Sequence, residues 1–113
     1  LPDGLTVGGS LYLQDCTGIT SLPEWFTCDS LYLDPARFDN VAYRENCGYS
    51  SRTIFAAWVN NEFRIAAGCF WDTLASFEDA VDESYSGDAA EAYKQAARDC
   101  VAELTEKLNK AGE

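Results

Sequence analysis

The sequence contains no histidine, and only eight lysines and arginines stand against nineteen aspartates and glutamates. Without histidine, a serine, threonine or cysteine nucleophile lacks its usual general base, and one common zinc ligand is missing. The five cysteines show no CxxC spacing, and no Walker-type glycine loop is present. We therefore expect a protein that is not an enzyme and that holds no metal or cofactor.

Long apolar runs are also absent. No segment approaches the roughly 18 to 20 apolar residues of a membrane span, and no basic and apolar leader opens the chain. These absences predict a cytoplasmic protein with no membrane partner. The odd number of scattered cysteines favours free, buried thiols, and a Cys16–Cys28 bridge is the alternative in an oxidising environment.

Apolar residues are nevertheless plentiful enough for one domain. The 113 residues are 47% hydrophobic and 13% aromatic. A chain of this size and composition can bury its own core, and the many large aromatic side chains argue against disorder. We expect one compact unit and a monomer.

The first third of the chain contains an internal repeat. Residues 1–13 (LPDGLTVGGSLYL) are echoed by residues 22–33 (LPEWFTCDSLYL), in which Ser-Leu-Tyr-Leu recurs after 20 residues and the second copy is one residue shorter. This period is typical of a short leucine-rich repeat, whose units each contribute a strand and a turn. Two units are too few to stand alone, so we expect residues 1–34 to pack on the rest and Asp34-Pro35 to end the second strand.

Residues 35–113 are predicted to form an α+β domain. Apolar residues alternate along residues 52–70, with Ile54, Ala56 and Trp58 on one face, and Asn60-Asn61 suits a two-residue turn. The pattern predicts an antiparallel hairpin. The whole chain is therefore expected to be α+β, with a short N-terminal leucine-rich-type β repeat, an antiparallel β-hairpin sheet and two C-terminal helices.

The helices are expected over about residues 73–85 and 88–110. Asp72 or Thr73 can cap the first helix. Its apolar positions have the spacing of one buried stripe. They are Leu74, Phe77, Val81 and Tyr85.

Negative charge is concentrated in one segment. Between Ile65 and Tyr93 the chain carries seven carboxylates and no lysine or arginine, whereas residues 89–112 carry four charges of each sign. Four of the acidic residues lie opposite the apolar stripe of the first helix, without a basic partner at i,i+4. They are Glu78, Asp79, Asp82 and Glu83. Like charges at this spacing destabilise a helix, so we interpret the face as an interaction surface, with solubility as the alternative.

A surface of one sign repels nucleic acid and attracts basic protein grooves. We therefore expect no direct contact with nucleic acid and a partner with a basic DNA-binding groove. The candidate partner-binding residues are the same four acids at the centre, with three more at the edges: Asp72, Asp88 and Glu91. A second candidate patch lies in the repeat: Asp3, Asp15, Asp29 and Asp34.

The repeat contains the segments LPDGLTVGGSL at residues 1–11 and GITSLP at residues 18–23. These sequences resemble the repeats of leucine-rich proteins encoded by bacteriophages, prophages and their proteobacterial hosts. Such a repeat is a scaffold that can carry many functions. As a small, acidic, phage-like chain the protein is also similar to anti-CRISPR proteins, and its C-terminal part resembles an inhibitor of the type I-C system. This resemblance implies binding to a CRISPR surveillance complex in the host cytoplasm, with target DNA blocked by DNA-like charge.

Three other functions fit the same sequence. An inhibitor of another DNA-binding defence protein would use the same acidic surface. A phage adaptor or structural protein would bind through apolar positions such as Trp25 and Phe26. A toxin-neutralising immunity protein would also be acidic.

Overall fold

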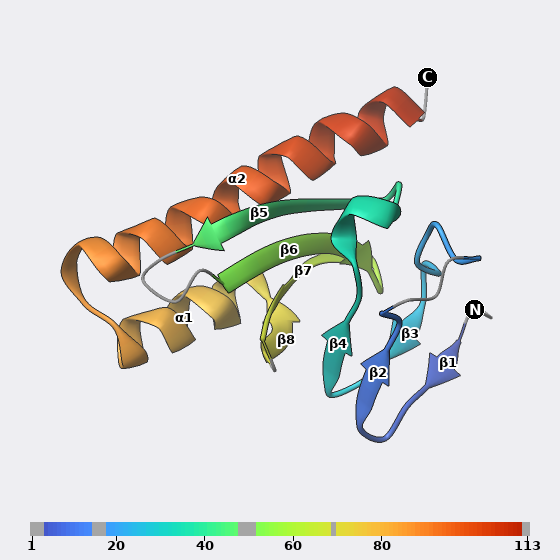
Figure 1. The fold of residues 1–113 in the computed structure, drawn as a ribbon, viewed down its shortest axis with the longest axis horizontal. Helices are drawn as coiled ribbons and strands as arrows, with labels where there is room; N and C mark the ends of the chain where they lie inside the picture. Colours follow the sequence, from blue (N-terminus) through green and yellow to red (C-terminus); the bar gives the residue numbers. More distant parts are fainter. Residues whose placement is uncertain (1–3, 15–17, 48–51, 69, 112–113) are drawn as a thin grey trace.

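Four antiparallel strands form the centre of the fold, in the spatial order β5-β6-β7-β8 (Figure 1). The computed structural model describes residues 4–14, 18–47, 52–68 and 70–111. Its central strands are β5 (Val41–Cys47), β6 (Arg52–Val59), β7 (Glu62–Ala67) and β8 (Phe70–Thr73). Two short parallel strand pairs precede this sheet and two helices follow it, so the expected α+β class is confirmed.

The N-terminal repeat stacks its two units side by side. Strand β1 (Leu5–Thr6) pairs with β3 (Phe26–Thr27), and β2 (Ser10–Tyr12) pairs with β4 (Ser30–Tyr32), both in parallel. Leu11 pairs with Leu31, which reproduces the 20-residue period. Leu5 pairs with Phe26, which is one residue beyond the position that a 20-residue period would give. The residue missing from the second copy therefore falls between its two strands.

Alternation along the repeat strands decides which side chains are buried. Leu13, Leu31 and Leu33 are buried, whereas the intervening Tyr12 is 64% exposed. The rings of Tyr12 and Tyr32 stack with centroids 4.9 Å apart. Each unit therefore has an inward leucine face and an outward tyrosine, as a period of two requires.

The second unit ends at Asp34-Pro35 as predicted. Strand β4 stops at Tyr32, and Pro35 begins a 3-10 helix, η1 (Pro35–Arg37). The fixed φ of proline suits the first helical position, where its missing N–H costs no hydrogen bond. This turn leads the chain into β5.

The predicted hairpin turn at Asn60-Asn61 is confirmed. Their φ angles are 57° and 61°, so both residues adopt the left-handed conformation that a type I′ turn requires. The turn sets Val59 opposite Glu62 and Trp58 opposite Phe63. Ile54, Ala56 and Trp58 lie on one face, as the alternation predicted.

The sheet is covered on both faces, which gives three layers (Figure 1). Ile54, Ala56 and Ile65 pack under the helices, against residues such as Leu104. The opposite face carries Phe55, Val59 and Trp71, and it packs against buried residues of the repeat. These are Leu13, Leu22, Phe26, Leu31 and Leu33. The central strands are thus apolar on both sides because both sides are buried.

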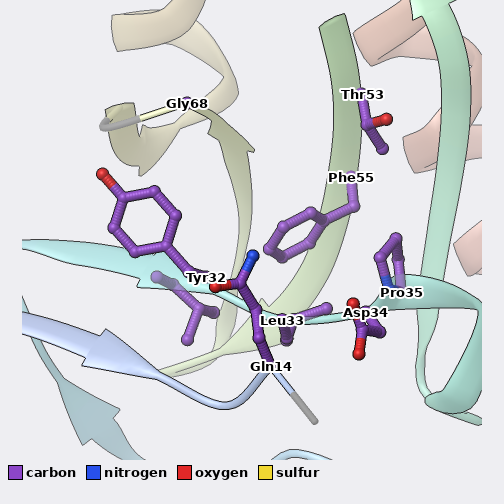
Figure 2. A pocket seen from close by; sticks show the side chains of 9 residues that line it. Gln14, Tyr32, Leu33, Asp34, Pro35, Thr53, Phe55 and Gly68 are labelled. Carbon is purple, nitrogen blue, oxygen red and sulfur yellow. The ribbon is translucent and has the colours of Figure 1, made fainter.

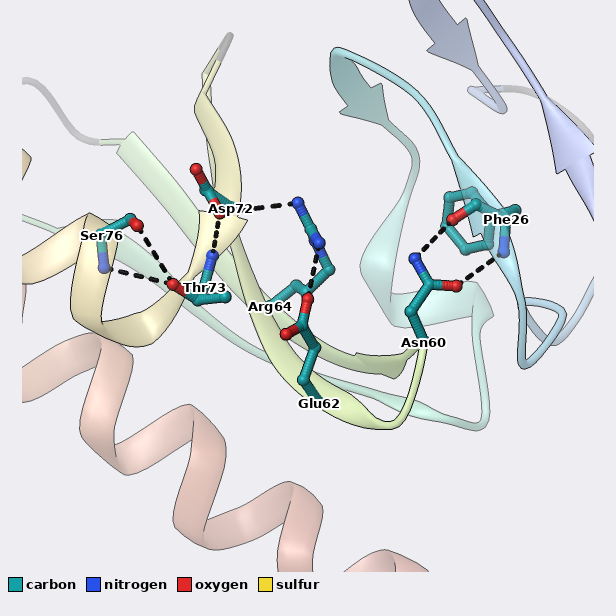
Figure 3. Close-up of polar contacts among 7 residues, drawn as sticks. All are labelled: Phe26, Asn60, Glu62, Arg64, Asp72, Thr73 and Ser76. Atoms are coloured by element: carbon teal, nitrogen blue, oxygen red, sulfur yellow. Dashed lines mark hydrogen bonds and ion pairs between the residues drawn. The ribbon is translucent and has the colours of Figure 1, made fainter.

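Two asparagine side chains join the repeat to the sheet through backbone groups. Asn60 Nδ2 donates to the Phe26 carbonyl at 2.9 Å, and Asn60 Oδ1 accepts from the Phe26 N–H at 3.2 Å (Figure 3). Asn40 makes the same pair of contacts with Leu22, both at 2.9 Å. Each amide therefore satisfies one backbone donor and one backbone acceptor, those of Phe26 in β3 and those of Leu22 in the segment before it.

Helices α1 (Leu74–Ser84) and α2 (Gly87–Ala111) form the outer layer on the other face. Thr73, rather than Asp72, caps α1, because its Oγ1 accepts from the Ser76 N–H at 3.3 Å. Phe77 and Val81 are buried as expected. The expectation that Tyr85 belongs to the buried stripe is wrong: it is 37% exposed at the extended C-cap, where its ring packs on Tyr93.

Cys28 and Cys100 carry free thiols. Burial raises the pKa of the Cys28 thiol. Cys100 is fully buried, and its Sγ donates to the Ile54 carbonyl at 3.7 Å. Cys28 is therefore not in a disulfide here; Cys16, the other half of the bridge considered above, lies outside the described residues.

Neither described helix combines the length and apolarity that a bilayer crossing needs.

Candidate acidic interaction surface

Cations from α2 reach part of the acidic face of α1. The two helices are joined by Tyr85 and Ser86, so the chain turns back and α1 packs against α2 (Figure 1). Lys94 Nζ lies 2.9 Å from Asp82 Oδ1 and 3.3 Å from Glu91 Oε1. One ammonium group therefore binds a carboxylate from each helix.

Arg98 makes the equivalent contact one turn further along α2. Its Nη2 donates to Glu78 Oε2. The hydrogen bond to Glu78 raises the pKa of Arg98, and the hydrogen bond to Asp82 raises the pKa of Lys94. Both pairs face solvent, where water and salt weaken them, so their main effect is to fix which carboxylates are neutralised.

Asp72 is held at the start of α1 by structural contacts (Figure 3). Its Oδ1 accepts from the Thr73 N–H at 2.7 Å and lies 3.6 Å from Arg64 Nη2. Arg64 also binds Glu62 at 2.7 Å, and its guanidinium carbon lies 5.3 Å from the centroid of the Trp71 ring. Asp72 therefore contributes to the joint between β7, β8 and α1.

Three of the seven predicted residues are exposed and make no ion pair within the described part of the chain: Asp79, Glu83 and Asp88. Asp79 and Glu83 are four residues apart on α1, about 6 Å along the helix axis. Asp88 lies in the first turn of α2, where the helix dipole favours a negative charge. These three residues, named here the free acidic face, are the carboxylates available to a partner.

Glu78 and Asp82 have no basic residue at i,i+4 within α1, but both bind cations of the second helix, which a pattern within one helix does not indicate. The sequence segment from Ile65 to Tyr93 lacks lysine and arginine, but Arg64 and Lys94, which flank it directly, fold back onto it. With Arg98, three cations thus bind four of the seven carboxylates.

The second predicted patch is not one cluster among the residues described. Asp29 directly precedes β4 and Asp34 follows it, so they lie at opposite ends of the strand. Asp34 Oδ2 is also 3.9 Å from Arg37 Nη1. Asp3 and Asp15 lie outside the described residues.

Exposed aromatic residues on the repeat were only partly anticipated. Trp25 is 53% exposed, as an adaptor surface requires, but its neighbour Phe26 is 2% exposed and stacks on Trp71. Tyr12 is the most exposed of the large aromatic residues described. Burial of Phe26 follows from its pairing in β3, which turns alternate side chains inward.

The acidic surface offers negative charge and hydrogen-bond acceptors. Within the described ranges, no group of three or more cysteines, aspartates and glutamates is arranged to hold a metal ion. No protein-family model, curated protein or solved structure matches this chain significantly.

Proposed function

We propose that this protein is a non-catalytic acidic inhibitor that binds the basic DNA-binding groove of a CRISPR surveillance complex in the cytoplasm of a bacterial host. The type I-C system is the target that the resemblance of the sequence implies. The observation that carries the proposal is the free acidic face, because Asp79, Glu83 and Asp88 are exposed and unneutralised in a protein of net charge −11.

A rigid display of carboxylates is what such competition requires. DNA-binding grooves hold phosphates with lysine and arginine, and much of their affinity comes from these charges. The free acidic face lies on two helices whose packing is fixed by buried residues such as Phe77 and Tyr93. The carboxylates are therefore presented without the entropy loss that ordering a flexible acidic tail would impose.

Target-DNA binding by a purified type I-C surveillance complex, measured with and without this protein over a salt series, tests the proposal. Loss of DNA binding at low salt, with inhibition that weakens as salt rises, is expected for competition between like charges. Unchanged DNA binding at every salt concentration contradicts it. The same assay on another DNA-binding defence protein separates the two inhibitor hypotheses.

A phage adaptor is the second candidate, favoured by the exposure of Tyr12 and Trp25 on the repeat. An adaptor that binds through these rings buries apolar surface, so its affinity is maintained or strengthened by high salt. Substituting both residues with serine would weaken an adaptor complex and leave the proposed inhibition unchanged.

A further inference from the structure

An apolar cavity of about 170 Å³ lies between α1 and the hairpin formed by β7 and β8. Its floor consists of the buried side chains of Ala67, Phe77 and Val81. Phe70, which is half-buried, packs edge-on against Phe77 with ring centroids 5.5 Å apart. Because an apolar cavity of about 150 Å³ already holds a benzene molecule, this one has room for one apolar side chain.

Two small residues of α1 leave this space open. Ala80 and Ser84 are four residues apart, so they form one row on the helix surface, next to Phe77 and Val81. Ala80 is half-buried, whereas Ser84 and Tyr85 at the rim are exposed. The cavity therefore opens to solvent along this row, and an exposed aromatic ring borders its mouth.

The free acidic face adjoins this mouth. Successive residues of an α-helix are about 100° apart around its axis, so the row of Asp79 and Glu83 lies directly beside the row of Ala80 and Ser84. Both carboxylates are exposed and belong to no ion pair within the described ranges. Asp82, on the other side of α1, is bound by α2. A ligand that enters the cavity therefore meets unneutralised negative charge at one border.

The geometry points to a single apolar side chain of the basic partner, flanked in the partner's own sequence by lysine or arginine, as the occupant of this cavity. The described lining is apolar except for the hydroxyl groups of Ser84 and Tyr85, so a charged group would lose its hydration there without compensation. An apolar side chain of leucine size is instead stabilised by burial. Its basic neighbours would lie beside Asp79 and Glu83, and this charge complementarity selects a basic segment over an acidic one.

The cavity between the repeat and the central sheet is of a different kind (Figure 2). It measures about 280 Å³, and its described lining includes the polar groups of Gln14, Asp34 and Thr53 beside aromatic rings. No described lining residue of that cavity belongs to α1 or α2. Of the two, the cavity beside Ala80 is the one whose lining includes the helix that carries most of the free acidic face.

This inference deepens the proposed function and rests on it for the basic character of the partner. The free acidic face would attract the partner over distance, and the cavity would receive one buried anchor. Interfaces commonly draw most of their affinity from a few anchors in well-packed pockets, whereas exposed ion pairs contribute little. The cavity therefore explains how a partner binds this surface more tightly than charge alone allows.

The test uses the whole protein and two peptides of equal charge. Acetyl-Arg-Lys-Leu-Lys-Arg-amide carries a central leucine, and the control peptide has serine in its place. In an NMR titration at low salt, we expect the leucine peptide to shift the methyl signals of Ala80 and Val81, and the serine peptide to shift only the backbone amides of Asp79 and Glu83. Equal methyl shifts from both peptides, or none from either, would overturn the inference. Methyl shifts with benzene but with neither peptide would also overturn it, in favour of a small apolar ligand.

Variants that fill the cavity then assign the contact. Ser84→Leu places an apolar side chain at the mouth without changing the net charge, and it should weaken binding of the leucine peptide about tenfold by excluding the leucine. Ala102→Leu is the matched control, because Ala102 is exposed on α2 and outside the cavity lining. Far-UV circular dichroism checks that the variants fold, and Ala80→Met, with its adaptable side chain, fills the cavity in case Ser84→Leu does not fold. Affinity for the leucine peptide that is the same in wild type and filled variants refutes the assignment.

These results are separable from those of the proposed function. Binding of the leucine peptide at the cavity without any effect on a surveillance complex would retain the cavity and reject that target. Inhibition that depends on Asp79 and Glu83 but survives Ser84→Leu would retain the proposed function and reject the cavity as its anchor.

Discussion

Lys94 Nζ of α2 lies 2.9 Å from Asp82 Oδ1 of α1. This ion pair neutralises one carboxylate of a helix face that carries only acidic charges in the sequence. Arg98 neutralises the charge of Glu78 in the same way. The helix pair therefore sorts its acids into a neutralised group that joins the helices and a free acidic face.

Lys94 should remain charged to unusually high pH. Its hydrogen bond to Asp82 raises its pKa above the ordinary 10.5. Because the pKa is raised in the folded state, the stabilisation is complete below about pH 10.5 and is lost as the pH rises through the folded-state pKa. NMR detection of the Lys94 side chain during an alkaline titration measures this, and Asp82→Asn should lower the midpoint. A wild-type midpoint at or below 10.5 contradicts the prediction.

Asn60 should contribute more to stability than its neighbour in the same turn. Asn60→Gly keeps the left-handed backbone but removes both side-chain contacts to Phe26, which we expect to cost about 1 to 3 kcal/mol in the free energy of unfolding. Asn61→Gly is the matched control, since it has the same backbone conformation and should change stability little. Urea denaturation measures the free energy of unfolding of both variants. Equal losses of stability in the two variants would show that Asn60 acts only through the turn.

Leu104 should be essential to the core between α2 and the sheet. Its side chain is fully buried among residues such as Ile54 and Cys100. Leu104→Ala leaves a cavity there, and we expect unfolding to become easier by about 2 to 5 kcal/mol. Thr105→Ala, one residue further and exposed, should change stability much less. Thermal unfolding followed by circular dichroism compares the two, and a tolerated Leu104→Ala would contradict this packing.

Local patterns predicted the elements of the fold well. The Asn60-Asn61 turn and the two helices follow from interactions between residues close in sequence, and the pairing of β2 with β4 follows the 20-residue repeat. The edge strands β5 and β8 were not predicted individually. β8 has four residues and runs directly into the cap of α1, and β5 carries charged residues such as Arg44 and Glu45 that obscure its apolar positions.

The candidate site could be predicted only in part. The sequence identified the acidic segment, but the partners of Glu78 and Asp82 depend on how α1 packs on α2, which a helical pattern does not specify. The cavity beside Ala80 depends on how α1 packs against the hairpin of β7 and β8, which a helical pattern does not specify either. One available signal was overlooked: Phe55, Ala57 and Val59 are apolar on the face opposite Ile54, which indicates a sheet covered on both sides.

The most direct test of the central claim is charge reversal on the free acidic face against an equal reversal elsewhere. Asp79→Lys, Glu83→Lys and Asp88→Lys are combined in one variant, and Asp29→Lys, Asp39→Lys and Glu106→Lys in the other, all at exposed positions. Both variants have the same net charge, and circular dichroism confirms folding. We measure inhibition of target-DNA binding by the type I-C surveillance complex at fixed low salt. Loss of inhibition in the first variant alone is the predicted result; equal inhibition by both would contradict the account.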